Sequence, residues 1–140
     1  MKYKFLEDVA IADIAFIAYG KDLNKLFENT ALALSDCMVN LKGLKNKIKK
    51  EISLKSDKLD ILLYDFLSEL IFIKDTDGLL FSKYKVNIDE KNISLRAICQ
   101  GEQIDRQRHE LRNDVKAVTM HLFEIKKLNG KYSCTIVVDI

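Results

Sequence analysis

The sequence of 140 residues has no proline, only five glycines and three cysteines. Without proline, no turn is fixed by a pyrrolidine ring and no segment is a stiff proline-rich linker. No apolar run reaches the roughly 18–20 residues that are needed to span a bilayer. The N-terminal segment becomes acidic at Glu7 and Asp8 and lacks a secretory pattern. We therefore expect a cytoplasmic protein without a membrane segment.

The three cysteines, Cys37, Cys99 and Cys134, are far apart and lie in largely apolar stretches. An odd number at such spacings fits neither a disulfide framework nor a zinc knuckle. We expect buried thiols that act as small hydrophobic side chains.

Charge of one sign does not dominate, because 23 basic and 21 acidic side chains leave a net charge of +2. Bulk electrostatics therefore give no argument for nucleic-acid binding. The local exception is the cluster from Lys42 to Lys50, which contains five lysines. It is interpreted as a solvated loop and strand edge, since edge lysines discourage aggregation, or as a docking patch for RNA or an acidic partner.

The chain contains enough apolar residues to form a core, since 48% of its residues are hydrophobic and seven are phenylalanine. Residues 1–140 are predicted to form a single domain. Residues 11–19 form a nearly continuous apolar run, which is typical of a strand covered on both faces. Asp22 is a candidate N-cap for a helix with 3–4 apolar spacing that ends at Gly43. A strand over 48–54 leads to a second helix that opens at Ser56 and ends at Asp75–Gly78.

The rest of the chain, from residue 79 onward, is predicted to be mainly strands. Residues 79–88 and 93–99 form one hairpin, and residues 115–126 and 132–139 form another through the favoured turn pair Asn129-Gly130. A mostly polar stretch, 101–113, separates the two hairpins. The order β-α-β-α-β-β-β-β predicts an α+β fold, with two main helices packed on one mainly antiparallel or mixed sheet.

Two features at opposite ends of the chain are candidates for chemistry. Asp13 is the single acid inside the first apolar strand, and a buried carboxylate costs several kcal/mol unless it is paired, hydrogen-bonded or metal-bound. A strand that runs to Asp139 and Ile140 places a side-chain carboxylate beside the terminal one, and a hard cation would offset their repulsion. The alternatives are an Asp13 that bonds backbone amides or reaches water, and a solvated terminus.

Other motifs are weak. Asp75-Thr76-Asp77-Gly78 resembles the start of a calcium loop but lacks its remaining acids, so a helix-terminating turn is favoured. His109 and His121 are the only histidines, and we interpret each as a surface or hydrogen-bonded residue. No phosphate loop, nucleophile elbow or Ser/His/Asp motif is present, so nothing indicates a free-standing enzyme.

Several segments, in this order and spacing, together resemble the archease family over essentially the whole chain. They are Ala12–Ile14, Ala18–Gly20, Leu26–Asn29, Ala31–Leu34, Asp36–Val39, Leu62–Leu70, Gly101-Glu102 with Asp105 and His109, Val115–His121 and Val138–Ile140. The resemblance implies an archease-like domain that activates the GTP- and metal-dependent RNA ligase of tRNA splicing by promoting its guanylylation and turnover. It also implies that the protein is not itself an enzyme and that tRNA is involved only indirectly.

The same resemblance assigns site residues. It implies a divalent metal, calcium first and magnesium or manganese as alternatives, bound by Asp13, Asp139 and Ile140. Lys116 matches a further functional lysine that could contact the partner or a phosphate. Ala10 and Ile11 stand where the family usually has His-Thr, and Ala15 replaces its usual glycine, so any role of that His-Thr pair does not transfer.

Two rival functions follow from other classes. A chaperone-like modulator would bind proteins and hold a metal only incidentally. A metal-dependent hydrolase would need a base and nucleophile arrangement that the sequence does not contain.

Overall fold

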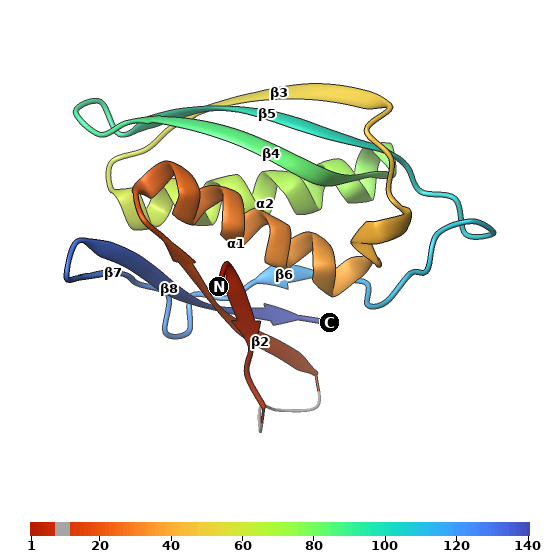
Figure 1. Ribbon diagram of the computed structural model, residues 1–140, viewed down its shortest axis with the longest axis horizontal. Helices are drawn as coiled ribbons and strands as arrows, with labels where there is room; N and C mark the ends of the chain where they lie inside the picture. The colour runs from red at the N-terminus through yellow and green to blue at the C-terminus, as the bar shows by residue number, and fades with distance from the viewer. Residues whose placement is uncertain (8–11) are drawn as a thin grey trace.

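Two antiparallel sheets enclose two helices in the computed structural model, which describes residues 1–7 and 12–140 (Figure 1). The five-stranded sheet contains β1 (Tyr3–Phe5), β2 (Asp13–Gly20), β6 (Ala117–Val118), β7 (Ile125–Leu128) and β8 (Lys131–Asp139). The three-stranded sheet has the order β3-β5-β4, formed by β3 (Ile48–Lys55), β4 (Leu79–Asp89) and β5 (Ser94–Gln103). Helices α1 (Leu23–Met38) and α2 (Leu59–Asp77) lie between the sheets, and a 3₁₀ turn, η1 (Leu41–Gly43), follows α1.

The α+β class and the antiparallel pairing are confirmed, whereas the strands form two sheets and not one. The reason is the width of the apolar surface on each helix. Helix α1 buries residues on several sides, and α2 does the same, with Leu62, Leu63, Phe66, Leu67, Leu70, Ile71 and Ile73 all buried. A helix with one apolar stripe needs one sheet, but helices that are apolar on opposite sides must be covered twice.

The predicted helix boundaries hold at some ends and not at others. Asp22 is the N-cap of α1, and its side chain accepts a hydrogen bond of 2.8 Å from the backbone N–H of Lys25. Helix α1 ends at Met38, five residues before Gly43, which lies in η1. Helix α2 begins at Leu59, because Ser56 turns its hydroxyl to Asp65 and Lys58 takes the cap position. Gly78 ends α2 in the left-handed conformation that favours glycine, with φ of 65°.

The first strand was predicted to begin at Ile11, which lies outside the described residues. In the structure, β2 begins at Asp13. The short strand β1 was not predicted, because three residues at the edge of a sheet carry little pattern.

At the C-terminal end of β2, Gly20 lies directly against α1. A Cβ atom there would be 2.2 Å from the backbone nitrogen of Leu26, so only glycine fits between strand and helix.

The expected strand over 115–126 is wrong as a single element. Residues 117–118 and 125–128 form β6 and β7, which both pair with β8, and a turn that contains Leu122 at φ of 58° separates them. The hairpin through Asn129-Gly130 is confirmed: both residues have positive φ, and Leu128 pairs with Lys131. Within the described ranges, none of the helices is long and apolar enough to cross a membrane.

The core fills the space between the layers. Its largest fully buried side chains include Phe16 from β2, Phe27 from α1, Phe66 from α2 and Phe81 from β4, so all three layers contribute. Cys37, Cys99 and Cys134 are buried in the same core, as predicted.

Thiol reactivity gives a direct check on this packing. Burial raises the pKa of Cys37 and Cys99 to about 12 and that of Cys134 to about 11. Because the thiolate is the reactive form, we expect all three cysteines to resist a disulfide reagent at pH 8 and to react together once the protein is unfolded in denaturant. Rapid modification of any one thiol in the native protein would contradict the core described here.

Candidate functional site

Strand β8 is the central strand of the larger sheet and pairs with β2 over eight residues. Its positions alternate: Cys134, Ile136 and Val138 are buried toward the helices, and Asp139 is exposed on the other face. The register places Asp13 directly opposite Asp139 at the end of the ladder. Two residues opposite each other in antiparallel strands direct their side chains to the same face, so the sheet brings the two carboxylates together. We call these two residues the carboxylate pair.

Main-chain hydrogen bonds fix the position of this end of β8 on both sides. The N–H of Ile140 donates to the carbonyl of Ala12 over 2.9 Å, and the N–H of Lys116 donates to the carbonyl of Asp139 over 2.8 Å. Beyond Lys116, Ala117 of β6 pairs with Asp139. The last residues of β8 are therefore held between two neighbouring strands, and the main-chain oxygens of Ile140 follow directly after the carboxylate pair.

The setting of Asp13 differs from the sequence expectation in one respect. A carboxylate within a strand covered on both faces would be buried, but Asp13 is the first residue of β2 and is half-buried. Its side chain lies on the face away from the helices, because Ile14 and Phe16 are the residues that alternate toward them. The cost of full burial therefore does not apply, and the carboxylate can be reached from solvent.

The carboxylate pair is electrostatically uncompensated in the part of the chain that the structure describes. No lysine, arginine or histidine nitrogen among residues 1–7 and 12–140 lies within 4.0 Å of either carboxylate. Like charges directly opposite in a sheet repel each other. Oxygen donors with unbalanced negative charge are suited to a hard divalent cation. No group of three His, Cys, Asp or Glu side chains gathers within these ranges, so a cation here would need main-chain oxygens such as those of Ile140.

Lys116 is brought next to the carboxylate pair through its backbone and not through an ion pair. Its side chain is exposed, and its ammonium group lies beyond 4.0 Å from both aspartates. The Ala10-Ile11 replacement lies outside the described residues.

A buried lysine that the sequence reasoning missed holds the neighbouring segment in place. Lys74 near the end of α2 is 8% exposed, and its Nζ lies 2.5 Å from Asp114 Oδ1 and 2.7 Å from the carbonyl of Val115. The hydrogen bond from Lys74 lowers the pKa of Asp114. Because residues 114–115 lead directly into Lys116 and β6, this buried ammonium positions the backbone that borders Asp139. A lysine at the end of a helix gives no sequence signal for such a role.

A second buried polar cluster organises the stretch 101–113. Glu102 is 3% exposed and binds the guanidinium of Arg108 through both of its oxygens. It also accepts the backbone N–H of Lys45 over 2.6 Å. The Arg108 hydrogen bond, helped by the Lys45 N–H, holds the pKa of Glu102 far below its usual range although burial opposes this. The cluster fastens this stretch to the turn before β3.

His109 belongs to the same cluster. Its Nδ1 accepts the backbone N–H of Asp105 over 2.9 Å, so the proton of the neutral ring is on Nε2. Nε2 lies 3.0 Å from Glu102 Oε2, although the N–H direction is too oblique for a regular hydrogen bond. His109 is thus a buried structural residue, whereas His121 is exposed in the turn between β6 and β7 and not in a strand.

The lysine cluster 42–50 lies in a loop and on a strand edge, as the first interpretation expected, and its role as a docking patch stays a prediction. Lys49 and Lys50 lie on β3, an edge strand, and Lys50 Nζ is 3.2 Å from Asp77. Lys47 Nζ is 3.9 Å from Glu102. Asp75–Gly78 is the expected helix end, since α2 runs through Asp77 and Gly78 caps it.

Comparison with known proteins agrees with this fold. Residues 3–140 match the Archease protein family (MTH1598/TM1083). The chain is 40% identical to the protein archease of Sulfurisphaera tokodaii over 139 residues, covering 99% of each chain. It is 41% identical to that of Methanothermobacter thermautotrophicus over 131 residues, covering 92% of this chain and 93% of the relative.

Two solved structures share the fold. The solution structure of Methanobacterium thermoautotrophicum protein 1598 superposes with a TM-score of 0.87 at 40% identity, with 99% of each chain covered. A Thermotoga maritima crystal structure, described as an archease and possible chaperone, has a TM-score of 0.68 at 17% identity, with 94% of this chain and 93% of that chain covered. The fold therefore defines a class of small α+β proteins in which two helices separate two antiparallel sheets. The chain belongs to the archease family.

The Glu102 cluster makes the stability depend on acid. A carboxyl group whose pKa is lowered by folding stabilises the protein above its unfolded pKa of about 4.3, and the contribution is lost as the pH falls toward the folded pKa. We expect Glu102→Gln to lower the free energy of unfolding by about 1.5–3 kcal/mol at pH 6, and by less at pH 3. Urea unfolding at both pH values measures the difference.

The matched control is Glu51→Gln. Glu51 also pairs with an arginine, Arg96, at 2.5 Å, but both side chains are more than half exposed. Such a pair contributes only about 0–1 kcal/mol. Equal losses for Glu102→Gln and Glu51→Gln, or a Glu102→Gln loss that does not diminish at pH 3, would contradict the structural role of the cluster.

Proposed function

We propose that this protein is an accessory factor of the GTP- and metal-dependent RNA ligase that joins tRNA halves, and that it promotes guanylylation and multiple turnover of that ligase without being a ligase itself. The observation that carries the proposal is the register of β2 and β8, which brings Asp13 and Asp139 face to face beside Ile140. Membership of the archease family supports it, since the same residues are those that the family resemblance assigned to a metal.

The donor set fits a hard divalent cation. Two carboxylates and the main-chain oxygens of Ile140 offer only oxygen, which suits calcium first and also magnesium or manganese. When bound, such a cation supplies positive charge that can neutralise phosphate oxygens at a nucleotidyl-transfer centre.

The chain's own residues contribute position and charge. Hydrogen bonds from Ile140 to Ala12 and from Lys116 to Asp139 hold the end of β8 rigid, so the carboxylate pair needs no rearrangement before it meets a partner. The repulsion between Asp13 and Asp139 is a cost of the unliganded protein that a cation relieves. The exposed ammonium of Lys116 can contact a phosphate as a point charge at the same end of the sheet. We propose that this end docks near the nucleotide site of the ligase.

Charge-removing variants separate this role from a structural one. Because Asp13→Asn and Asp139→Asn each remove a repulsion, we expect them to leave the unfolding free energy unchanged or to raise it by up to about 1 kcal/mol. Calcium at about 100 times its Kd should stabilise the unmodified protein by about 2.7 kcal/mol and the variants by much less. Thermal unfolding with and without calcium measures both effects, and multiple-turnover ligation should fall at least about tenfold for each variant.

The control for these variants is Asp57→Asn, an exposed aspartate in the turn before α2. It should keep both the calcium effect and the activation. Residues added after Ile140 should reduce activation more than residues added before Met1. Undiminished activation by Asp13→Asn, Asp139→Asn and the C-terminally extended protein would refute the proposal.

A chaperone-like modulator is the second candidate, favoured by large apolar side chains that the described surface exposes, among them Phe72, Met120, Leu122 and Leu128. The Thermotoga maritima relative is described as a possible chaperone. This function predicts that activity survives loss of the carboxylate pair and that several unrelated proteins bind. Aggregation suppression of an unrelated client, compared between the unmodified protein and Asp139→Asn, distinguishes the two functions.

A further inference from the structure

The β2–β8 ladder ends in groups of opposite charge. Asp13 and Asp139 form one end, and at the other end Gly20 pairs with Tyr132, with Lys21 and Lys131 flanking this pair. From Asp13 to Gly20 the strand advances by about 23 Å, at roughly 3.3 Å per residue. The basic end is therefore too far from the carboxylate pair to belong to the same site.

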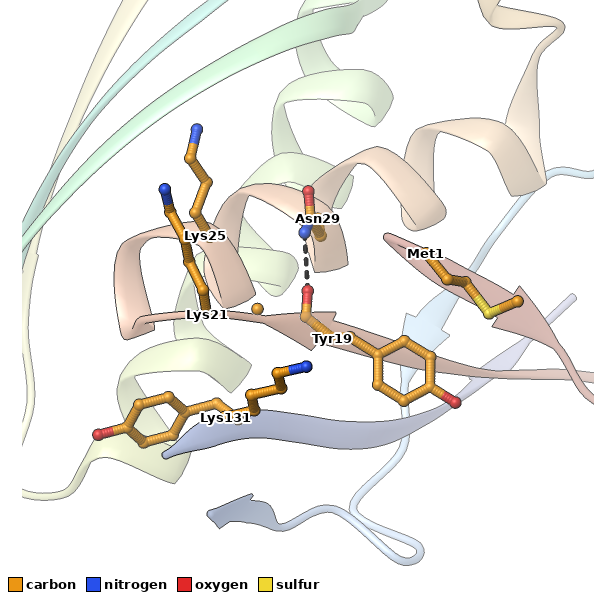
Figure 2. A pocket seen from close by; sticks show the side chains of 8 residues that line it. Met1, Tyr19, Lys21, Lys25, Asn29 and Lys131 are labelled. Atoms are coloured by element: carbon orange, nitrogen blue, oxygen red, sulfur yellow. Dashed lines mark hydrogen bonds between the residues drawn. The ribbon is translucent and has the colours of Figure 1, made fainter. Parts of the chain in front are cut away.

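Two adjoining hollows lie at this basic end, and both are lined by Lys25 and Asn29 of α1. Their volumes are about 480 Å³ and about 340 Å³. Figure 2 shows the larger one, where Lys21 and Lys25 extend in the same direction and Lys131 lies on the β8 side. We call the two hollows together the basic groove, because five lysines line it: Lys2, Lys21, Lys25, Lys83 and Lys131.

Acidic side chains do not neutralise the basic groove. Among the residues that the structure describes, Glu28 is the only acid that lines it, and both of its carboxylate oxygens are engaged. One lies 3.1 Å from Lys25 Nζ, and the other accepts the backbone N–H of Val86 over 2.9 Å. Across the described ranges, the other four lysines have no carboxylate within 4.0 Å. Asp22 is close in sequence, but its side chain caps α1.

Aromatic side chains form part of the wall. Tyr19 and Tyr132 line the larger hollow, and Lys127 Nζ lies 5.3 Å above the Tyr132 ring. Asn29 donates to the carbonyl of Tyr19 over 2.7 Å, which fixes the end of β2 against α1 (Figure 2). Positive charge along a concave surface, together with aromatic rings, is the combination that tracks a phosphate backbone and stacks its bases.

We propose that the basic groove binds single-stranded nucleic acid, with its lysines on successive phosphates and Tyr19 against a base. Two hollows in succession suit a strand better than a single nucleotide. This inference goes beyond the proposed function and does not depend on it, because it requires no cation at the carboxylate pair and no ligase.

A fluorescein-labelled ten-nucleotide oligouridine RNA is the probe, with binding to the full chain followed by fluorescence anisotropy at several salt concentrations. The variant Lys21→Gln/Lys25→Gln/Lys131→Gln changes exposed side chains only and should leave Tm unchanged. We expect its Kd to rise at least about tenfold at low salt, and the slope of log Kd against log salt to fall by about 2, since each single-strand contact contributes about 0.7. Tyr19→Leu should weaken binding about fivefold or more while the salt slope stays the same.

The matched control removes the same charge from another basic surface. Lys45, Lys49 and Lys55 are exposed on β3 and in the turn before it, and β3 is the edge strand opposite β4, which borders the basic groove. Lys45→Gln/Lys49→Gln/Lys55→Gln should bind the RNA within about threefold of the unmodified protein.

Three outcomes of the direct binding measurement would overturn the proposal, and a competition experiment adds a fourth. The first three are absence of RNA binding by the unmodified protein, equal loss in the groove variant and the control variant, and a groove variant that binds as well as the unmodified protein. Competition identifies the source of the phosphate. If free GMP at the same nucleotide concentration displaces the RNA, the groove binds a free nucleotide and the proposal of a nucleic-acid strand is refuted. If only unlabelled oligouridine displaces it, the proposal is supported.

Discussion

The pairing of β2 with β8 is the interaction on which the rest of the structure depends. These strands come from opposite ends of the chain, yet their eight-residue ladder forms the centre of the larger sheet and supports β1, β6 and β7. Their inward side chains, such as Phe16 and Ile136, belong to the same core as the buried side chains of both helices. The same register sets the chemistry on the outward face, because a slip of one residue would turn Asp139 toward the core and separate it from Asp13.

Local signals in the sequence were sufficient for most individual elements. Asp22 as a cap, Gly78 as a helix end and Asn129-Gly130 as a hairpin turn all act through interactions within a few residues, and each is found as expected. The division of the strands into two sheets could not be predicted in this way. It depends on which helix surfaces are covered, and an apolar helix looks the same in sequence whether one sheet or two cover it.

The candidate site shows the same limit. Asp13 and Asp139 were identified from the sequence as conspicuous acids and from the family resemblance, but their direct opposition is a matter of register, which becomes visible only when the strands are paired. Lys74 and Glu102 were not singled out as structural residues. Charged side chains in polar segments usually face solvent, and only the three-dimensional arrangement shows that partners more than five residues away bury them.

The distance along the chain between β2 and β8 has a consequence for the order of events during synthesis. The three-stranded sheet and α2 are built from residues 48–103. The strands of this sheet are therefore synthesised within a short interval of one another and can pair early. Strand β2 lies near the N-terminus, and more than a hundred residues are translated after it before its partner β8 is synthesised. Its apolar side chains stay exposed in the nascent chain during that interval, and the end of the sheet that carries Asp13 and Asp139 is assembled last.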